Sequence, residues 1–122
     1  MNDELKNNVD LRVRTKLFAL RVIRLYVALP KTMESQVMGK QILRSGTSVG
    51  AQYREAKRAR STAEFVSKIE SALQELEETI YWLELLAESD IVPAAKLSDL
   101  NREADELIAI FVTSVKTAKQ QR

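Results

Sequence analysis

The residues best able to do chemistry in this sequence are basic side chains that recur at helical spacing. They fall into two groups, each spanning an arc of about 80° when successive residues turn by 100° around a helix. The members are Arg14, Arg21 and Arg24, followed by Lys40, Arg44, Arg54 and Arg58. Cations aligned in this way can neutralise phosphates and bind RNA or DNA without reading its sequence. The same stripes also fit solvated faces, or faces paired with an acidic helix of the chain.

Charge is distributed unevenly along the chain, although the formal net charge is only +2. Residues 1–60 contain 13 Lys and Arg against 5 Asp and Glu, whereas residues 61–122 contain 6 against 12. An asymmetry of this size either holds the two halves together or presents a basic surface to an acidic partner. Nucleic-acid binding and a protein-only assembly are both consistent with it.

Catalytic and metal-binding chemistry finds little support in the composition. The chain has no His and no Cys, so it lacks the commonest general base and any thiol nucleophile. Ser45 and Ser48 have no histidine to activate them. Glu70, Glu77 and Glu84 repeat every seven residues, but a carboxylate-bridged metal pair in a bundle also needs Glu-x-x-His motifs on facing helices. We therefore expect no enzyme activity, no cofactor and no metal.

The spacing of apolar residues predicts four helices, over residues 11–29, 33–60, 62–88 and 94–119. Pro30 ends the first helix, a capping box from Ser61 to Glu64 opens the third, and Pro93 precedes the fourth. Only 3 Gly and 2 Pro are present, too few for a sandwich or barrel with its frequent turns. The expected fold is all-α, an up-down-up-down antiparallel four-helix bundle that occupies residues 1–122 as a single domain.

The middle of the second predicted helix is unusual, because residues 45–51 read Ser-Gly-Thr-Ser-Val-Gly-Ala. Each glycine inside a helix costs about 1 kcal/mol relative to alanine. Close approach of a neighbouring helix or a deliberate kink would each explain glycines in a continuous helix. A break into two helices is the alternative.

Two features suggest contacts between copies of the chain. Tyr81 and Trp82 lie at the edge of the apolar stripe of the third helix, and aromatic residues are enriched in subunit contacts. Core packing is the alternative for this pair. The apolar residues of the first helix cover more than the stripe of about 100° that one bundle buries. Either this helix is central, or its second face meets another protomer.

No part of the sequence predicts a membrane or secretory protein. The N-terminus lacks the apolar core of a signal peptide, and no apolar run is long enough to span a bilayer. We therefore expect a cytoplasmic location and no membrane partner. Tyr53 is expected on the inward side of its helix, which leaves base stacking on this ring without support.

The segment from Gln41 to Phe65 resembles a known family. It reads QILRSGTSVGAQYREAKRARSTAEF and combines small residues, a glutamate and a capping box in a fixed order. In this it is similar to the bacterial four helix bundle protein family, whose first members are encoded in intervening sequences of 23S rRNA genes. The matching positions are Gln41, Arg44, Ser48, Glu55, Arg60, Ser61, Glu64 and Phe65. Residues 75–77 and 103–106 also resemble the sequence pattern of this family.

Three positions depart from the family pattern. Gly50 stands where the family usually has Pro, Gln52 where it has Asn, and Ala56 where it has Gly. The resemblance therefore transfers no role of that Asn to Gln52. The wider family includes pentameric, basic accessory proteins of diversity-generating retroelements, which bind a reverse transcriptase and nucleic acid. The resemblance thus implies a homopentamer and permits RNA, DNA or a reverse transcriptase as a partner.

These observations together predict a non-enzymatic, homo-oligomeric bundle that binds nucleic acid or assists a ribonucleoprotein. The alternative is a protein-only scaffold or assembly subunit, in which neighbouring acidic helices neutralise the basic stripes.

Overall fold

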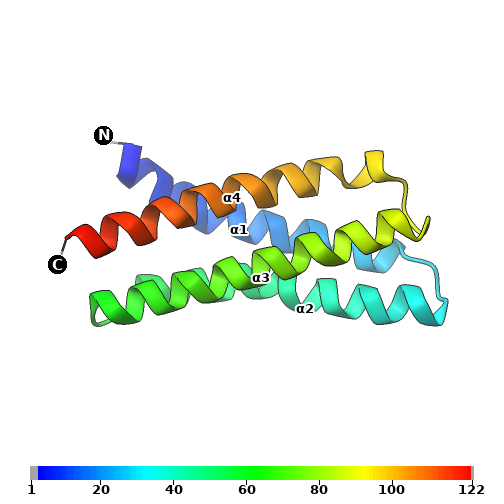
Figure 1. The fold of residues 1–122 in the computed structure, drawn as a ribbon, viewed down its shortest axis with the longest axis horizontal. Helices are drawn as coiled ribbons and strands as arrows, with labels where there is room; N and C mark the ends of the chain where they lie inside the picture. Colours follow the sequence, from blue (N-terminus) through cyan, green and yellow to red (C-terminus); the bar gives the residue numbers. More distant parts are fainter. Residues whose placement is uncertain (1–2, 122) are drawn as a thin grey trace.

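Four antiparallel helices make up the molecule. The computed structural model describes residues 3–121, with side chains from residue 11 onward. The helices are α1 (Asp3–Ala28), α2 (Met33–Lys57), α3 (Thr62–Glu88) and α4 (Ala94–Gln120), and no strand occurs in this part of the chain. They run alternately up and down, so both chain ends lie at the same end of the bundle (Figure 1). This confirms the predicted all-α four-helix bundle.

Two helix boundaries differ from the predicted ones by more than one residue. α1 begins at Asp3 rather than at residue 11, because residues 3–10 contain neither Gly nor Pro to interrupt the helix. α2 ends at Lys57 rather than at residue 60, because the chain must turn before α3 begins. Ser61 adopts an extended conformation there, with φ −150° and ψ 161°, and caps α3.

α2 is continuous through its small residues, and its glycines allow α1 to approach closely. A Cβ atom added at Gly46 would lie 2.7 Å from a methyl group of Val22, and one at Gly39 would lie 2.7 Å from Leu29. At Gly50 the nearest atom is the hydroxyl oxygen of Thr15, at 3.2 Å. Of the explanations open at the sequence level, close helix approach is the one that the structure supports, and the helix does not break in two.

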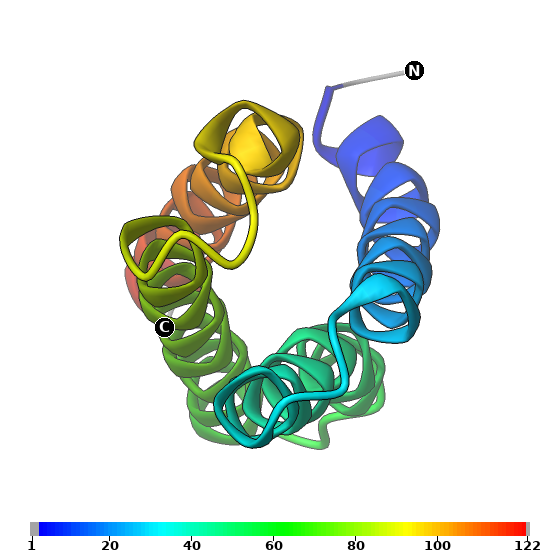
Figure 2. The same ribbon diagram turned by 90° about the vertical axis from the view of Figure 1, so that its right-hand side faces the viewer.

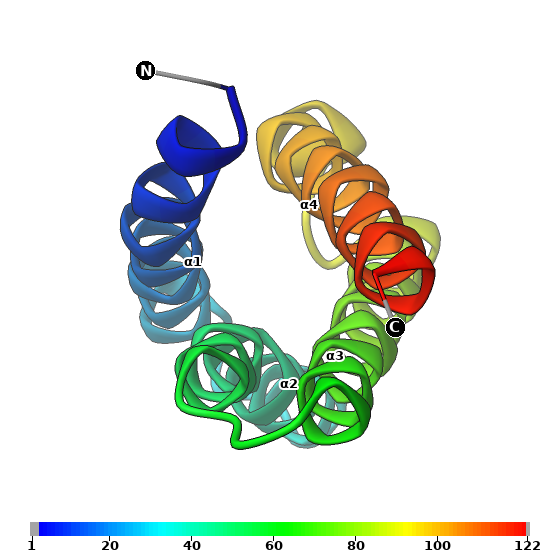
Figure 3. The same cartoon turned by 90° about the vertical axis from the view of Figure 1, so that its left-hand side faces the viewer.

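The helices follow one another around the bundle in chain order. α1 packs on α2, α2 on α3 and α3 on α4, whereas α1 and α4 touch only sparsely (Figures 2 and 3). Large apolar side chains from all four helices fill the centre, among them Phe18, Ile42, Leu76 and Phe111. Tyr53 is in this core as expected, and its ring stacks on Phe111 with the centroids 5.8 Å apart.

Ion pairs connect the sparse side of the bundle between α1 and α4. The Arg14 guanidinium donates to both carboxylate oxygens of Glu103, at 2.9 and 2.6 Å, and to Glu106 at 3.0 Å. The arginine and Glu103 are both mostly buried, with side-chain exposures of 21% and 18%. A bidentate pair of this kind fixes the distance between the two helices.

Candidate nucleic-acid interface

The strongest concentration of cations lies where α2 ends and the chain turns into α3. Four basic residues fall within seven positions, and we call this group the basic end: Arg54, Lys57, Arg58 and Arg60. All four are exposed. No carboxylate of the described residues lies within 4.0 Å of their side-chain nitrogens. Their positive charge is therefore available to an anionic partner.

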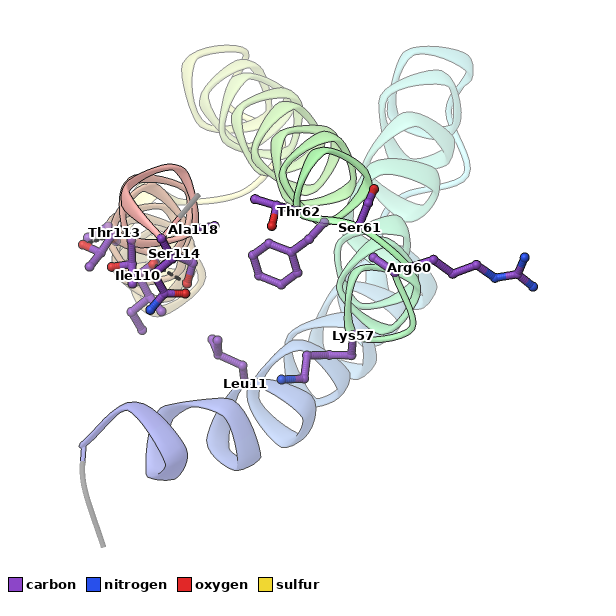
Figure 4. A pocket seen from close by; sticks show the side chains of 14 residues that line it. Leu11, Lys57, Arg60, Ser61, Thr62, Ile110, Thr113, Ser114 and Ala118 are labelled. Carbon is purple, nitrogen blue, oxygen red and sulfur yellow. Dashed lines mark hydrogen bonds between the residues drawn. The ribbon is translucent and has the colours of Figure 1, made fainter.

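Local structure explains why these side chains fan outward. Arg54 and Lys57 occupy the last turn of α2, and Arg58 is its C-cap, with a backbone N–H that donates to the carbonyls of Ala56 and Glu55. Cations near a helix C-terminus are favoured by the helix dipole. Beyond the cap, the chain has left the helix at Arg60, whose side chain points away from the bundle (Figure 4).

A pocket of about 910 Å³ opens beside the basic end. Its wall combines apolar side chains such as Leu11, Phe65 and Ile110 with hydroxyl groups such as that of Ser61. The Lys57 side chain reaches across its mouth toward α1 (Figure 4). Helices α1, α2, α3 and α4 all contribute to the pocket, because their ends meet at this pole of the bundle.

The capping box at the start of α3 uses its own polar groups. The Ser61 hydroxyl oxygen accepts from the Glu64 backbone N–H at 3.1 Å, and the Glu64 carboxylate accepts from the Arg60 backbone N–H at 3.3 Å. The Ser61 bond is the predicted half of the capping box, whereas Glu64 reaches one residue further back than expected, to the residue before the cap. The first turn of α3 is therefore capped by neighbouring residues of the chain itself. The side chains of the basic end take no part in this cap and can bind a ligand.

The seven predicted phosphate contacts do not form one surface. Arg14 is engaged with α4, and the half-buried Arg21 lies on the same side of α1. Arg24 is exposed and lies about 80° around the helix from Arg14. Arg44 is held by α3, at 3.6 Å from Glu75 and 3.2 Å from Glu78. These pairings follow the alternative that the basic stripes meet acidic helices.

The remaining members of the α2 group are exposed but unequally placed. Lys40 lies 14 residues before Arg54, which corresponds to about 21 Å along the helix. Arg54 and Arg58 are four residues apart and project from the same side of α2. These two are the predicted residues that the basic end contains.

One cation that the sequence stripes left out also lies on the α2 side of α1. Burial raises the pKa of the Tyr53 phenol above its ordinary value, and the positive charge of Arg12 acts in the opposite direction. Arg12 is exposed near the start of the described side chains of α1, and its charge acts on a phenol of α2.

The residues of the family motif bond partly within α2 and partly across to α3. Lys68 donates to the Glu55 carboxylate at 3.1 Å, and the Ser48 hydroxyl donates to the carbonyl of Arg44 at 2.7 Å. Phe65 packs against the core from the first turn of α3. Gln41 accepts from the Arg44 guanidinium at 3.5 Å.

A linked pair of carboxyl groups sits beside Arg44. Burial, together with a hydrogen bond to Glu78, raises the pKa of Glu75 above its ordinary value. The hydrogen bond from Glu75, helped by Arg44, lowers the pKa of Glu78. Of the two carboxyls, the more buried Glu75 therefore binds a proton more readily, and Arg44 lies beside both.

The aromatic pair of α3 lies on the surface between α2 and α3. Tyr81 is 53% exposed, and its ring meets that of the half-buried Trp82 edge-on at a centroid distance of 5.2 Å. Both residues line a groove together with Gln52, Glu75, Glu77 and Glu78 of α2 and α3. Tyr81 is therefore outside the core, whereas Trp82 packs partly against it.

Two classes of site are missing from the described part of the chain. Residues 3–121 contain no cluster of three or more acidic, His or Cys side chains that would hold a metal ion. None of their helices is long and apolar enough to cross a membrane.

Comparisons with known proteins place the chain among its relatives. The family model of the 23S rRNA-intervening sequence protein matches residues 7–113. A crystal structure of a protein of unknown function from the S23 ribosomal protein family of Bacteroides thetaiotaomicron is 39% identical, with a TM-score of 0.82. It covers 87% of this chain, and 98% of its own length is matched. A search of curated proteins gives no match. Neither the family model nor the description of the crystal structure names an enzyme activity. Because the family model matches most of its length, the chain belongs to the 23S rRNA-intervening sequence protein family.

Proposed function

We propose that this protein binds the phosphate backbone of nucleic acid at its basic end, as a non-enzymatic homo-oligomer. The observation that carries the proposal is the group of exposed cations Arg54, Lys57, Arg58 and Arg60, which lack carboxylate partners among the described residues. Neutralising a phosphate with such a side chain releases counterions and provides affinity without sequence preference. The name of the family adds an RNA context to this surface.

An oligomer would strengthen such binding without any new contact. Each copy adds one basic end, and linked sites raise the overall affinity through effective concentration. The homopentamer implied by the family resemblance would present five basic ends to one nucleic acid.

Charge reversal at the basic end tests the proposal. Arg54→Glu combined with Arg58→Glu should weaken binding to generic single-stranded RNA and DNA at least about tenfold, and should lower the salt slope by about 2. Lys96→Glu with Arg102→Glu is the matched control, because both residues are exposed on α4 near the opposite pole. Fluorescence anisotropy across a salt series gives both quantities.

The control separates a local contact from general charge. If both double variants weaken binding equally, the basic end has no special role. If wild type shows no salt-dependent binding, the nucleic-acid proposal fails.

A protein-only scaffold is the second candidate, and the exposed apolar side of α1 favours it. In that case the assembly would form without binding RNA or DNA. Measuring mass and nucleic-acid affinity on the same samples distinguishes the two functions.

A further inference from the structure

The side of α1 that points away from the core is largely apolar. We call it the α1 outer face, and its exposed members are Val13 (52%), Leu17 (50%), Leu20 (37%), Ile23 (39%) and Val27 (67%). The spacing from residue 13 to residue 27 corresponds to a strip of about 21 Å along the helix. An apolar strip that a single bundle leaves in water marks a site of protein contact.

Positive charge borders this strip. From residue 11 to the end of α1 the helix contains five Lys and Arg and no Asp or Glu. Lys16 and Arg24 are exposed and lie within the arc of the α1 outer face. A partner surface that carries carboxylates therefore suits this face better than a second copy of the same face.

The outer side of α3 has the complementary properties. α3 contains seven Glu and a single Lys, and the exposed Tyr81 supplies an apolar ring among them. We call this surface the α3 outer face, with Glu77, Tyr81 and Glu84 as its exposed members. Gln52 lines the groove beside this face. Its side-chain amide oxygen Oε1 is buried and has no hydrogen-bond partner within the described residues. Acceptors and an aromatic ring in one place suit a guanidinium or an ammonium group.

The two faces are separated within one molecule. α1 and α3 each pack on α2 and lie diagonally across the bundle, so neither face can reach the other in the same copy (Figure 3). A contact between them must join two copies, with the α1 face of one against the α3 face of the next. Such head-to-tail contacts leave one free face at each end and so build rings or filaments.

We infer that the α1 outer face of one copy docks on the α3 outer face of a second copy. This rests on the homo-oligomer in the proposed function and identifies the surfaces that form it. The apolar strip lies against Tyr81 and its groove, while Lys16 and Arg24 face Glu77 and Glu84. The basic end remains outside the contact and open to nucleic acid.

The first test breaks the apolar strip. Leu20→Glu should convert the wild-type oligomer to a species of 13.9 kDa, the mass of one chain, in sedimentation velocity and native mass spectrometry. Val112→Glu is the matched control, because Val112 on α4 is 38% exposed and Leu20 is 37% exposed. The control should keep the wild-type mass, and circular dichroism should show equal helix content in both variants.

The second test exchanges the charges of the two faces. Lys16→Glu with Arg24→Glu should disassemble the oligomer, and Glu77→Lys with Glu84→Lys should do the same. The variant with all four changes should assemble again, because the two faces are once more opposite in sign. A merely destabilising effect would not be repaired by the second pair.

The outcomes distinguish this contact from the nucleic-acid proposal. A monomeric wild type, an assembled Leu20→Glu variant or a four-fold variant that stays monomeric would overturn the docking. Loss of RNA binding in the Arg54→Glu, Arg58→Glu variant at unchanged mass concerns the basic end alone and leaves the docking standing.

Discussion

α2 meets its two neighbours by opposite means. Toward α1 it presents Gly39, Gly46 and Gly50. Because glycine has no side chain, the side chains of α1 can lie close to the backbone of α2 at these positions. Toward α3 it presents hydroxyl and charged groups, including Ser45, whose hydroxyl lies 2.8 Å from that of Thr79 with both side chains buried. The first interface depends on close steric fit, whereas the second includes a buried polar pair.

The difference has consequences for how each interface fails. A tight contact between the side chains of one helix and the glycines of the other is damaged by added volume, because protein interiors have little free space. A buried polar contact is damaged when one partner is removed, because the other then loses its hydrogen bond. The following substitutions test whether the two interfaces of α2 differ in this way.

Adding volume at Gly46 should have the largest effect. Gly46→Leu forces a side chain into the space of Val22 and should destabilise the fold by about 3 kcal/mol, more than the helix propensity gained. Ala51→Leu, on the exposed side of the same helix, should cost little. Urea unfolding measures both, and a small loss at Gly46 would show that α1 can move away freely.

Removing one partner at the α2–α3 contact should have an intermediate effect. Thr79→Val keeps the shape but leaves Ser45 with a single long hydrogen bond, 3.4 Å to the Ile42 carbonyl, and should cost about 1–2 kcal/mol. Adding Ser45→Ala to Thr79→Val should restore part of the loss. Thr113→Val on the exposed side of α4 is the control and should be near neutral. Additive effects in the double variant would argue against a paired contact.

The sequence was sufficient for the parts of this architecture that depend on periodicity. The apolar stripe of α3 and the prolines at positions 30 and 93 predict helices, their number and their inward faces, because these are local properties. The capping box at Ser61 was predictable for the same reason.

The candidate site was less predictable, because it depends on how each helix is rotated against its neighbours. Periodicity separates inward from outward, but it does not say which neighbour an outward side chain meets. Arg14 and Arg44 look equivalent to Arg54 in sequence, yet the first contacts α4 and the second contacts α3. That choice is made by non-local packing, above all by the close contact at the α2 glycines.

Loss of the capping box should have a small effect. Glu64→Ala removes the acceptor for the Arg60 N–H at an exposed helix end and should cost about 0.5–1 kcal/mol. Thermal unfolding of this variant beside Ser61→Ala compares the two halves of the box. A loss as large as that of Gly46→Leu would mean that the α2–α3 turn, and not the α1 contact, controls stability.

The smallest effect we predict is a pH dependence at the polar interface. The pKa of Glu75 is raised in the folded state, mainly by burial, so its contribution to stability is full below the unfolded pKa and is lost as the pH rises through the folded pKa. The pKa of Glu78 is lowered, so its contribution is present above the unfolded pKa and is lost as the pH falls through the folded pKa. The two trends oppose each other, and wild type should therefore show only a weak net dependence from this pair.

Glu75→Gln separates the two contributions, because an amide resembles the protonated carboxyl but does not titrate. Relative to wild type, this variant should gain stability as the pH rises from acid toward neutral, since wild type alone must then ionise a partly buried carboxyl. Chemical unfolding at several pH values gives the difference. Gly46→Ala is the control at the steric interface, where no titratable group is involved, and its effect should not change with pH. A pH-independent difference for Glu75→Gln would show that folding does not raise the pKa of Glu75.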